Sequence, residues 1–189
     1  DAGAGVGYTG IRIRGVNAQS TNITINGIPY NDAESLGTYW VDLPDFASSV
    51  ENLQIQRGVG TSTNGSSAFG ASINILTDLI SVNPYFENAN SVGSYNTLKN
   101  TFKFSTGILN DNFEFSGRLS KIDSDGYIDR ASSDLKSYFL QGTYKKNTTM
   151  VKALSFGGHE ITYQAWNGID GDTLDSDRTY NPSGMYIDQ

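Results

Sequence analysis

The sequence lacks cysteine altogether and contains a single histidine, His159. Without cysteine, the chain can form neither a disulfide framework nor a thiolate metal site. No nucleophile motif lies beside His159, so a Ser-His-Asp arrangement has no support, and a lone histidine in a loop is most often a solvated polar residue. The sequence therefore indicates no catalytic residue, no metal site and no cofactor, and we expect a protein that is not an enzyme.

Long apolar runs are also missing. No stretch of 18 apolar residues occurs, so no membrane-spanning helix is predicted. Membrane-spanning β-strands stay possible, because they need only about 9–11 residues of alternating character. The aromatic content of 12%, with eleven tyrosines and nine phenylalanines, fits such strands and fits a soluble β-sandwich equally well.

Basic residues are scarce and unevenly placed. The formal net charge is −7, which argues against nucleic-acid binding because phosphate neutralisation needs clustered Lys and Arg. No lysine precedes Lys99, so Arg12, Arg14 and Arg57 are the only basic residues before it. A planar guanidinium suits fixed carboxylate partners, and Arg14 and Arg57 each end a strand-like segment, which favours placed ion pairs over simple surface charge.

Acidic residues gather in two segments, 123–126 and 170–177. Their carboxylates could supply oxygen ligands to Ca²⁺, but neither segment has the spacing of an EF-hand loop, and acidic loops are usually only solvated. Whether they bind calcium is left open by the sequence.

Three short alternating segments occur in order in the first third of the chain. They are Ile-Arg-Ile-Arg-Gly at 11–15, Ile-Asn-Gly-Ile-Pro-Tyr-Asn-Asp at 25–32, and Val-Glu-Asn-Leu-Gln-Ile-Gln-Arg-Gly at 50–58, followed by a Ser/Gly-rich stretch and Ser-Ile-Asn-Ile-Leu-Thr at 72–77. Alternation of this kind predicts half-buried strands at 11–15, 22–26, 52–57 and 72–77. Asn26-Gly27 predicts a tight turn, Asp42 or Asp45 predicts the cap of a short helix over 44–49, and 66–69 could form one helical turn.

This order resembles the plug domain of TonB-dependent outer-membrane transporters, whose pattern runs approximately IRIRG, DGVP, VEVLRGP and INIxT. The resemblance covers roughly residues 1–78. Two departures are mild, because Asn26-Gly27 replaces the usual Asp-Gly and Gly70-Ala71 replaces the usual Gly-Gly, and both keep the turn chemistry.

After Asp78 the sequence changes to repeated hairpins. Five strands are predicted around 85–93, 98–108, 113–120, 138–144 and 149–156, with tight turns at 110–112 and 145–148 and longer loops at 122–134 and from Gly157 onward. Tight turns that alternate with longer loops are typical of outer-membrane barrels. The fold class expected is therefore an α+β plug domain with a small mixed sheet at 1–78, followed at 79–189 by antiparallel hairpins that begin a transmembrane β-barrel.

The resemblance implies how the parts would work. Arg14 and Arg57 match family arginines that pair with glutamates of the barrel wall, and the segments 31–40 and 60–64 match the apical plug loops that touch the ligand. A periplasmic TonB-type coupling protein would pull on a segment upstream of Asp1. Five strands cannot close a barrel, because an open edge in lipid leaves backbone groups unsatisfied, so we expect a piece of a longer chain in the outer membrane of a Gram-negative bacterium.

Exposed aromatic side chains in polar loops indicate ligand binding, because rigid rings give contact area at low entropic cost. The candidates are Tyr30, Tyr39 and Trp40 in the plug loops and Tyr163, Trp166 and Tyr180 in the last, extracellular loop. The same rings could instead lie in the lipid interface or pack within their loops.

Three functions are compatible with the sequence: energised uptake of a scarce large nutrient such as an iron-siderophore, haem or cobalamin; glycan import by the same family; or a soluble secreted β-rich adhesin or carbohydrate-binding module. The first is favoured, with outer-membrane lipid and a metal-chelate or similar ligand as its partners. The sequence does not identify the ligand.

Overall fold

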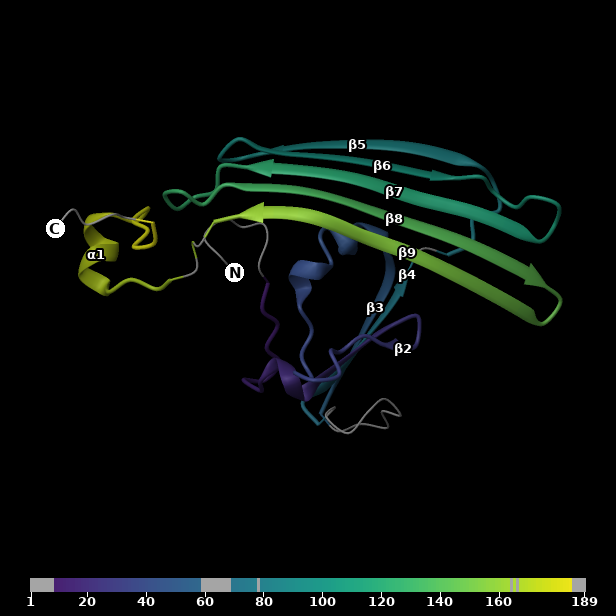
Figure 1. The fold of residues 1–189 in the computed structure, drawn as a ribbon, viewed down its shortest axis with the longest axis horizontal. Helices are drawn as coiled ribbons and strands as arrows, with labels where there is room; N and C mark the ends of the chain where they lie inside the picture. The colour runs from purple at the N-terminus through teal and green to yellow at the C-terminus, as the bar shows by residue number, and fades with distance from the viewer. Residues whose placement is uncertain (1–8, 59–68, 78, 164, 166, 185–189) are drawn as a thin grey trace. The chain divides into compact units, whose positions relative to one another are not determined.

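The computed structural model describes residues 9–58, 69–77, 79–163, 165 and 167–184. Within these ranges it has nine strands, three short 3₁₀ helices and one α-helix (Figure 1). The strands are β1 (Thr21–Ile25), β2 (Ile28–Pro29), β3 (Val50–Arg57), β4 (Ala71–Thr77), β5 (Tyr85–Gly93), β6 (Thr97–Ser105), β7 (Phe113–Ser124), β8 (Ser133–Lys146) and β9 (Thr149–Thr162). The helices are η1 (Ala18–Ser20), η2 (Trp40–Asp42), η3 (Phe46–Ser49) and α1 (Gly171–Ser176). The chain divides into a first unit, Gly10–Ile80, and a second unit that contains Ser81 onward.

The first unit contains a small mixed sheet. Its strand order is β2-β1-β4-β3, with β1 parallel to β4 and β3 antiparallel to β4. The strands predicted at 22–26, 52–57 and 72–77 are confirmed to within two residues at each end, the usual uncertainty of strand boundaries. The mixed sheet expected from the sequence is therefore present.

The segment 11–15 does not form the predicted strand. Arg14 and Gly15 have φ angles of +53° and +73°, and the Val16 amide donates to the Ile13 carbonyl at 3.1 Å, which closes a tight turn. Only an isolated bridge between Ile13 and Val16 remains. Two consecutive left-handed residues cannot continue an extended strand, so this part of the sequence prediction was wrong.

The Asn-Gly signal marks a hairpin, as predicted. Asn26 and Gly27 have φ angles of +51° and +83°, the pair of left-handed residues that a two-residue hairpin turn requires, and β1 then pairs antiparallel with β2. The Asn26 side chain also donates to the Thr77 hydroxyl at 2.9 Å, while the Thr77 amide donates back to the Asn26 side chain at 3.1 Å. The turn is thereby tied to the end of β4.

The buried apolar residues of the first unit come mainly from its two central strands. They are Ile23, Ile25, Leu43, Phe46, Ala71, Ile73 and Ile75. All five residues of β1 are buried, polar ones included, and the Thr24 hydroxyl donates to the Asn74 side chain at 2.7 Å on the neighbouring strand. A polar side chain is tolerated there because this hydrogen bond offsets its loss of water.

The helix predicted over 44–49 is present as the shorter η3. Asp45 occupies the N-cap position with a left-handed φ of +50°, but its carboxylate accepts from the Ser48 hydroxyl at 2.7 Å rather than from a helix amide. The backbone takes part as well, because the Asp45 carbonyl accepts from the Ser48 amide at 3.1 Å. The helical turn expected at 66–69 lies outside the described residues, apart from Phe69.

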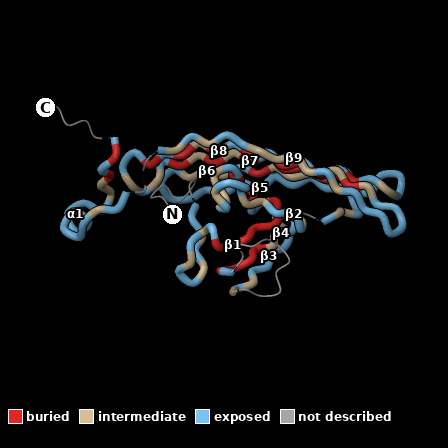
Figure 2. Tube along the Cα trace, turned by 60° about the horizontal axis from the view of Figure 1, so that its bottom comes forward, coloured by how far each residue is buried: buried red, intermediate tan, exposed pale blue. Residues whose placement is uncertain are grey.

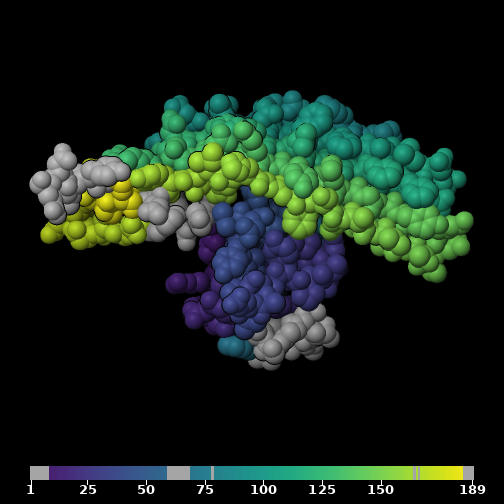
Figure 3. All heavy atoms as spheres, in the orientation of Figure 1, coloured from purple at the N-terminus to yellow at the C-terminus, as the bar shows by residue number. Residues whose placement is uncertain are grey.

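The second unit contains five antiparallel strands in sequence order, β5-β6-β7-β8-β9, which lie side by side in one curved sheet (Figure 1). Their side chains pack into one continuous layer, coloured teal to yellow-green in Figure 3. The count and the antiparallel arrangement agree with the sequence prediction. Among the described residues, no helix is long and apolar enough to cross a membrane.

The last three strands are longer than the alternation indicates. β9 was expected to end near Phe156, but its pairing with β8 continues through Ser133 opposite Thr162. The prediction that the last loop starts at Gly157, with His159 in that loop, is therefore wrong. Gly157 and Gly158 interrupt the alternation in the sequence, whereas the backbone ladder with β8 continues past them.

Of the connections between the five strands, the one between β6 and β7 is longer than expected. Residues 94–96 and 125–132 join strands at one end of the sheet, and residues 106–112 and 147–148 join them at the other. The tight turn expected at 110–112 is there, with the Leu109 amide 2.6 Å from the Phe113 carbonyl. This turn is only the last part of the connection 106–112, because β6 already ends at Ser105. The Thr106 amide still donates to the Phe115 carbonyl at 2.9 Å.

In the five-stranded sheet, β7 and β8 bury a largely polar face and expose an apolar face, as the alternating colours along these two strands show (Figure 2). On β7, Glu114, Ser116, Arg118 and Ser120 are buried, whereas the residues between them are largely exposed. The exposed apolar set on these two strands is Phe113, Phe115, Leu119, Tyr138 and Leu140. In a sheet with one face in water, the polar side chains face the water and the apolar side chains are buried.

One substitution tests the core of the first unit. Ile73 in β4 is 2% exposed, so Ile73→Ala leaves a cavity and should lower the free energy of unfolding by about 2–5 kcal/mol. The matched control is Ile28→Ala, because Ile28 is 69% exposed and its truncation should change stability by less than about 0.5 kcal/mol. Urea unfolding followed by Trp40 fluorescence, in a Trp166→Phe background, measures both, and equal effects would contradict the assigned core.

Candidate functional site

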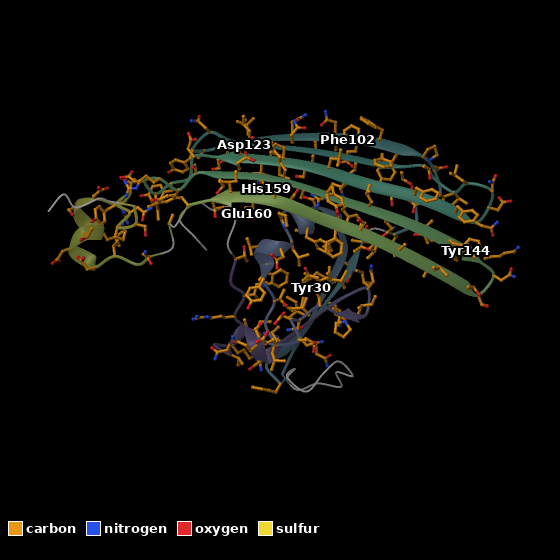
Figure 4. The ribbon with its side chains drawn as sticks, viewed as in Figure 1. Tyr30, Phe102, Asp123, Tyr144, His159 and Glu160 are labelled. Atoms are coloured by element: carbon orange, nitrogen blue, oxygen red, sulfur yellow. The ribbon has the colours of Figure 1, made fainter. Side chains whose placement is uncertain are left out.

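The first candidate site is the loop that follows β2, where three aromatic residues were predicted to contact a ligand. Tyr39 is exposed, Tyr30 is half-buried, and Trp40 begins η2 and is half-buried. Burial raises the pKa of the Tyr30 phenol, and the negative charge of Asp42 raises that pKa further. Tyr30, labelled in Figure 4, is therefore a neutral hydrogen-bonding group, while Tyr39 presents a ring to solvent.

Asn31 anchors this loop to the sheet. Its side-chain oxygen accepts from the Ile23 amide at 2.7 Å, and its side-chain nitrogen donates to the carbonyls of Thr21 at 2.9 Å and Leu36 at 2.8 Å. One side chain thus bonds β1 on one side and the loop on the other. Sequence reasoning missed this role, although an Asn directly after a strand and a turn is a signal for such backbone bonding.

Asp32 shapes the next turn. Its carboxylate accepts from the amides of Ser35 at 2.7 Å and Glu34 at 3.1 Å, and the Leu36 amide donates to its carbonyl at 3.0 Å. The hydrogen bonds from Ser35 and Glu34 lower the pKa of Asp32, so the carboxylate stays charged to unusually low pH. The loop is ordered by its own polar groups, and of its three aromatic residues only Tyr39 is exposed.

A small pocket lies under this loop. Its walls are Ile11, Ala18, Thr21, Ile23, Thr38 and Trp40. The hydroxyls of Thr21 and Thr38 are buried without a hydrogen-bond partner among the described residues. Trp40 therefore covers a pocket with an apolar wall and two hydroxyls that can still bond.

The two arginines predicted to pair with carboxylates are exposed. Arg14 lies in the tight turn after Ile13, and Arg57 ends β3. Neither has a carboxylate within 4 Å in the described ranges of the chain. Their pairing with barrel-wall glutamates stays a prediction.

The second candidate site is at the end of the five-stranded sheet that carries the connection 125–132. Tyr163 follows β9 directly and is 40% exposed, and Tyr180 is half-buried after α1. Trp166, the third residue predicted there, lies outside the described residues. The turn at Tyr95 contributes one more ring, since Tyr95 and Tyr127 pack edge to face with their centroids 5.5 Å apart.

Arg130 holds the two loops of this site together. Its guanidinium donates to the carbonyls of Asn181 at 2.5 Å and Ser183 at 3.2 Å, and the Asn181 side chain donates to the Asp129 carbonyl at 2.9 Å. Asn181 is almost completely buried, as are Ala131 and Ala165, which pack together beside Ile128. Sequence reasoning treated both segments as solvated loops and missed this small structured unit.

The acidic residues after β9 serve a local structural role. Asp170 caps α1, with its carboxylate accepting from the Thr173 amide at 2.9 Å and from the Thr173 hydroxyl at 2.8 Å, and these bonds lower the pKa of Asp170. No group of three acidic or histidine side chains able to hold a metal ion occurs in the described part of the chain.

Solved structures with the same fold are outer-membrane receptors and transporters. The pyoverdine receptor FpvA from Pseudomonas aeruginosa PAO1 is 15% identical, with a TM-score of 0.61 over 81% of this chain and 23% of that chain. The copper transporter OprC is 14% identical, with a TM-score of 0.65 over 82% and 27%. The ferric yersiniabactin uptake receptor FyuA from Yersinia pestis is 18% identical, with a TM-score of 0.62 over 85% and 26%.

Residues 1–72 match the family model of the TonB-dependent Receptor Plug Domain. The first unit is a TonB-dependent receptor plug domain. The five antiparallel strands after it match the region that follows the plug in the solved receptors, and the chain spans only 23% to 27% of the length of the three receptors described above. No curated protein matches the chain.

This identification confirms the family resemblance read from the sequence. TonB-dependent receptors are transporters and not enzymes, and they belong to the outer membrane of Gram-negative bacteria, as the sequence predicted. The loop with Tyr30, Tyr39 and Trp40 is accordingly a loop of the plug domain.

The Asn31 anchor gives a direct test in the plug domain. Asn31→Ala leaves the Ile23 amide without its acceptor and should cost about 1–3 kcal/mol of stability, with faster hydrogen exchange at Ile23 and Leu36. Asn17→Ala is the matched control, because Asn17 is exposed and its side chain makes no cap bond. Unchanged exchange at Ile23 in Asn31→Ala would show that the anchor does not hold the loop.

The Arg130 bonds give a test in the second site. Arg130→Gln removes the donors to two carbonyls, so the segment 177–183 should become more sensitive to limited proteolysis and exchange its amides faster, by about tenfold for a loss of roughly 1.4 kcal/mol. Arg178→Gln is the control, since Arg178 is exposed. Equal protection in both variants would mean that Arg130 does not join the loops.

Proposed function

We propose that the chain is the plug domain at 1–78 and, at 79–189, the first five strands of the barrel of a TonB-dependent transporter, which takes up a scarce large nutrient across the outer membrane. The observation that carries this proposal is the plug-domain match followed by a sheet in which β7 and β8 expose an apolar face and bury a largely polar one. Lipid on the exposed side explains that arrangement, because barrel strands alternate apolar outward and polar inward.

Open strand edges support the presence of further strands. β5 and β9 are the two edge strands of the five-stranded sheet, and each has a row of backbone groups on its outer side. Such groups cost several kcal/mol each in lipid when they are unsatisfied, so a membrane sheet must close on itself. Strands from a longer parent chain would pair with both edges.

The substrate we propose is a metal chelate of the iron-siderophore class, with haem and cobalamin as the related possibilities. In the plug, the exposed ring of Tyr39 and the neighbouring Trp40 suit a large, partly apolar ligand, because rigid rings give contact area at low entropic cost. Tyr163 and Tyr180, which belong to the second unit, are separate candidates for ligand contact. FpvA, described with bound pyoverdine, and FyuA, described as a ferric yersiniabactin receptor, share the fold.

Energy for uptake would come from a TonB-type protein in the periplasm, which is the coupling that the family name implies. The plug sheet supports a mechanical role, because β1 and β4 are tied together by backbone pairing and by the Thr24–Asn74 and Asn26–Thr77 side-chain bonds. A pull on the plug would then move the sheet as one body and carry the loop that Asn31 anchors with it.

Uptake of labelled ligands by cells that carry the full-length parent protein tests this function. Accumulation of one labelled chelate should require the energised coupling protein. Tyr39→Ala and Trp40→Ala should weaken its binding by about tenfold each, as expected for loss of roughly 1.4 kcal/mol of ring contact.

The control is Tyr85→Ala, because Tyr85 is the first residue of β5 and belongs to neither of the aromatic segments proposed to contact the ligand. Receptor abundance in the membrane must be equal in all cells. Uptake that continues without the coupling protein would rule out the proposed transport, and unchanged binding in both loop variants would remove Tyr39 and Trp40 from the ligand site.

A further inference from the structure

The exposed face of the five-stranded sheet ends in a charged patch. Cross-strand register places Lys121 opposite Lys136 and Lys136 opposite His159, so three basic side chains form a row across β7, β8 and β9. The next row along places Asp123 opposite Asp134. We call these five residues the charged patch.

Its place on the sheet is at the end that carries the 125–132 connection. In Figure 4, Asp123 and His159 lie toward this end, whereas Tyr144 lies toward the other. At that other end Tyr144 packs with Phe113 with ring centroids 5.0 Å apart, which is the arrangement of an aromatic interface girdle. The charged patch thus occupies the position where a second girdle would be expected.

The spacing along the strand agrees with this position. Phe113 and Lys121 are eight residues apart on β7, which is about 27 Å at about 3.4 Å per residue. At a strand tilt of about 40° this is a height of about 20 Å, close to the roughly 25 Å apolar band of a barrel. The patch therefore lies where acyl chains end and headgroups begin.

Within the charged patch, both carboxylates form their ion pairs with the same lysine. Lys121 forms ion pairs with Asp123 at 2.5 Å and with Asp134 at 2.7 Å, so it is shared by both carboxylates. Lys136 and His159 form no ion pair within 4 Å in the described ranges, although the Asp134 carboxylate attracts both at longer range. Like-charged residues directly opposite one another are destabilising, and this cost is removed when an anion binds between them.

We propose that Lys136 and His159, with Lys121 beside them, bind the phosphate group of a glycolipid in the outer leaflet of the membrane. This inference rests on the proposed function, because it requires the apolar face to lie in the bilayer. The 125–132 connection and the long segment that follows β9 both lie at this end, which marks it as extracellular, since barrel loops are longer on that side. The Lys136 ammonium gives charge-assisted hydrogen bonds to phosphate oxygens, the His159 imidazole adds an N–H donor, and Asp123 and Asp134 hold Lys121 in its place in the row.

Binding of lipid A to the full-length parent protein, purified free of lipid in detergent, tests the proposal. Lys136→Gln should weaken binding of diphosphorylated lipid A about tenfold, which corresponds to roughly 1.4 kcal/mol. The matched control is Lys146→Gln, because Lys146 is exposed on the same strand and, ten residues away, on the same face at the opposite end of the sheet. The control should bind as the unmodified protein does, and Lys136→Arg should retain most of the affinity.

A second arm uses the unmodified protein alone and does not depend on how a variant folds. Lipid A without its phosphates should bind about as weakly as the phosphorylated form binds to Lys136→Gln. Inorganic phosphate should not compete at millimolar concentration, because it lacks the acyl chains that lie on the apolar band.

Equal affinity for the two lipids, equal loss in Lys136→Gln and Lys146→Gln, or full competition by inorganic phosphate would each overturn the proposal. Failure of the proposed function is seen separately. In that case the parent protein would not be found in the outer membrane at all, whereas a failure of the phosphate site alone leaves membrane insertion and ligand uptake intact.

Discussion

The alternation of side chains across the five-stranded sheet is the constraint on which the rest of the structure depends. β7 and β8 bury mostly Ser, Thr, Gln, Arg and Glu on one face, together with Ile122, Leu135 and Phe139, and expose Phe, Leu and Tyr on the other. Water on the exposed face would make this arrangement costly, because each apolar side chain loses about 1.5–3 kcal/mol of burial. Lipid on the exposed face would remove that cost. The aromatic pair Phe113–Tyr144 and the charged patch would then lie near the two opposite surfaces of the membrane.

In the plug domain a different constraint applies, since a small unit must keep its polar backbone and its aromatic loop ordered. Its sheet does so by bonds between side chains and backbone. Asn31 links β1 to the aromatic loop, and Asn26 ties the β1–β2 turn to the end of β4. Removal of one partner leaves a buried group unsatisfied, which costs more than the bond itself contributes. The loop that carries Tyr39 and Trp40 is therefore held by a few specific residues.

Much of the fold could be predicted from the sequence because its signals are local. Alternation at 22–26, 52–57 and 72–77 and the Asn26-Gly27 turn each produced the expected element. The segment 11–15 alternates equally well but forms a turn, because the left-handed backbone at Arg14 is not visible in a residue pattern. The full length of β9 and the Arg130 unit were missed for a related reason: pairing with β8 and bonds to residues some 50 positions away are non-local. The arginine and aromatic site residues stay predictions, since the partners expected for them are a ligand and further strands.

The central claim is that one face of β5–β9 contacts lipid. Residues 1–189 contain no cysteine, so a single cysteine introduced among them and labelled with a fluorophore is the only one in this part of the protein, and any cysteine elsewhere in the parent is first replaced by serine. In the full-length parent protein reconstituted in bilayers with brominated acyl chains, labels at Leu119→Cys and Leu140→Cys should be strongly quenched, and labels at Ser120→Cys and Gln141→Cys on the buried face should not be. Equal quenching of neighbouring positions, or quenching of the polar face alone, would contradict lipid contact.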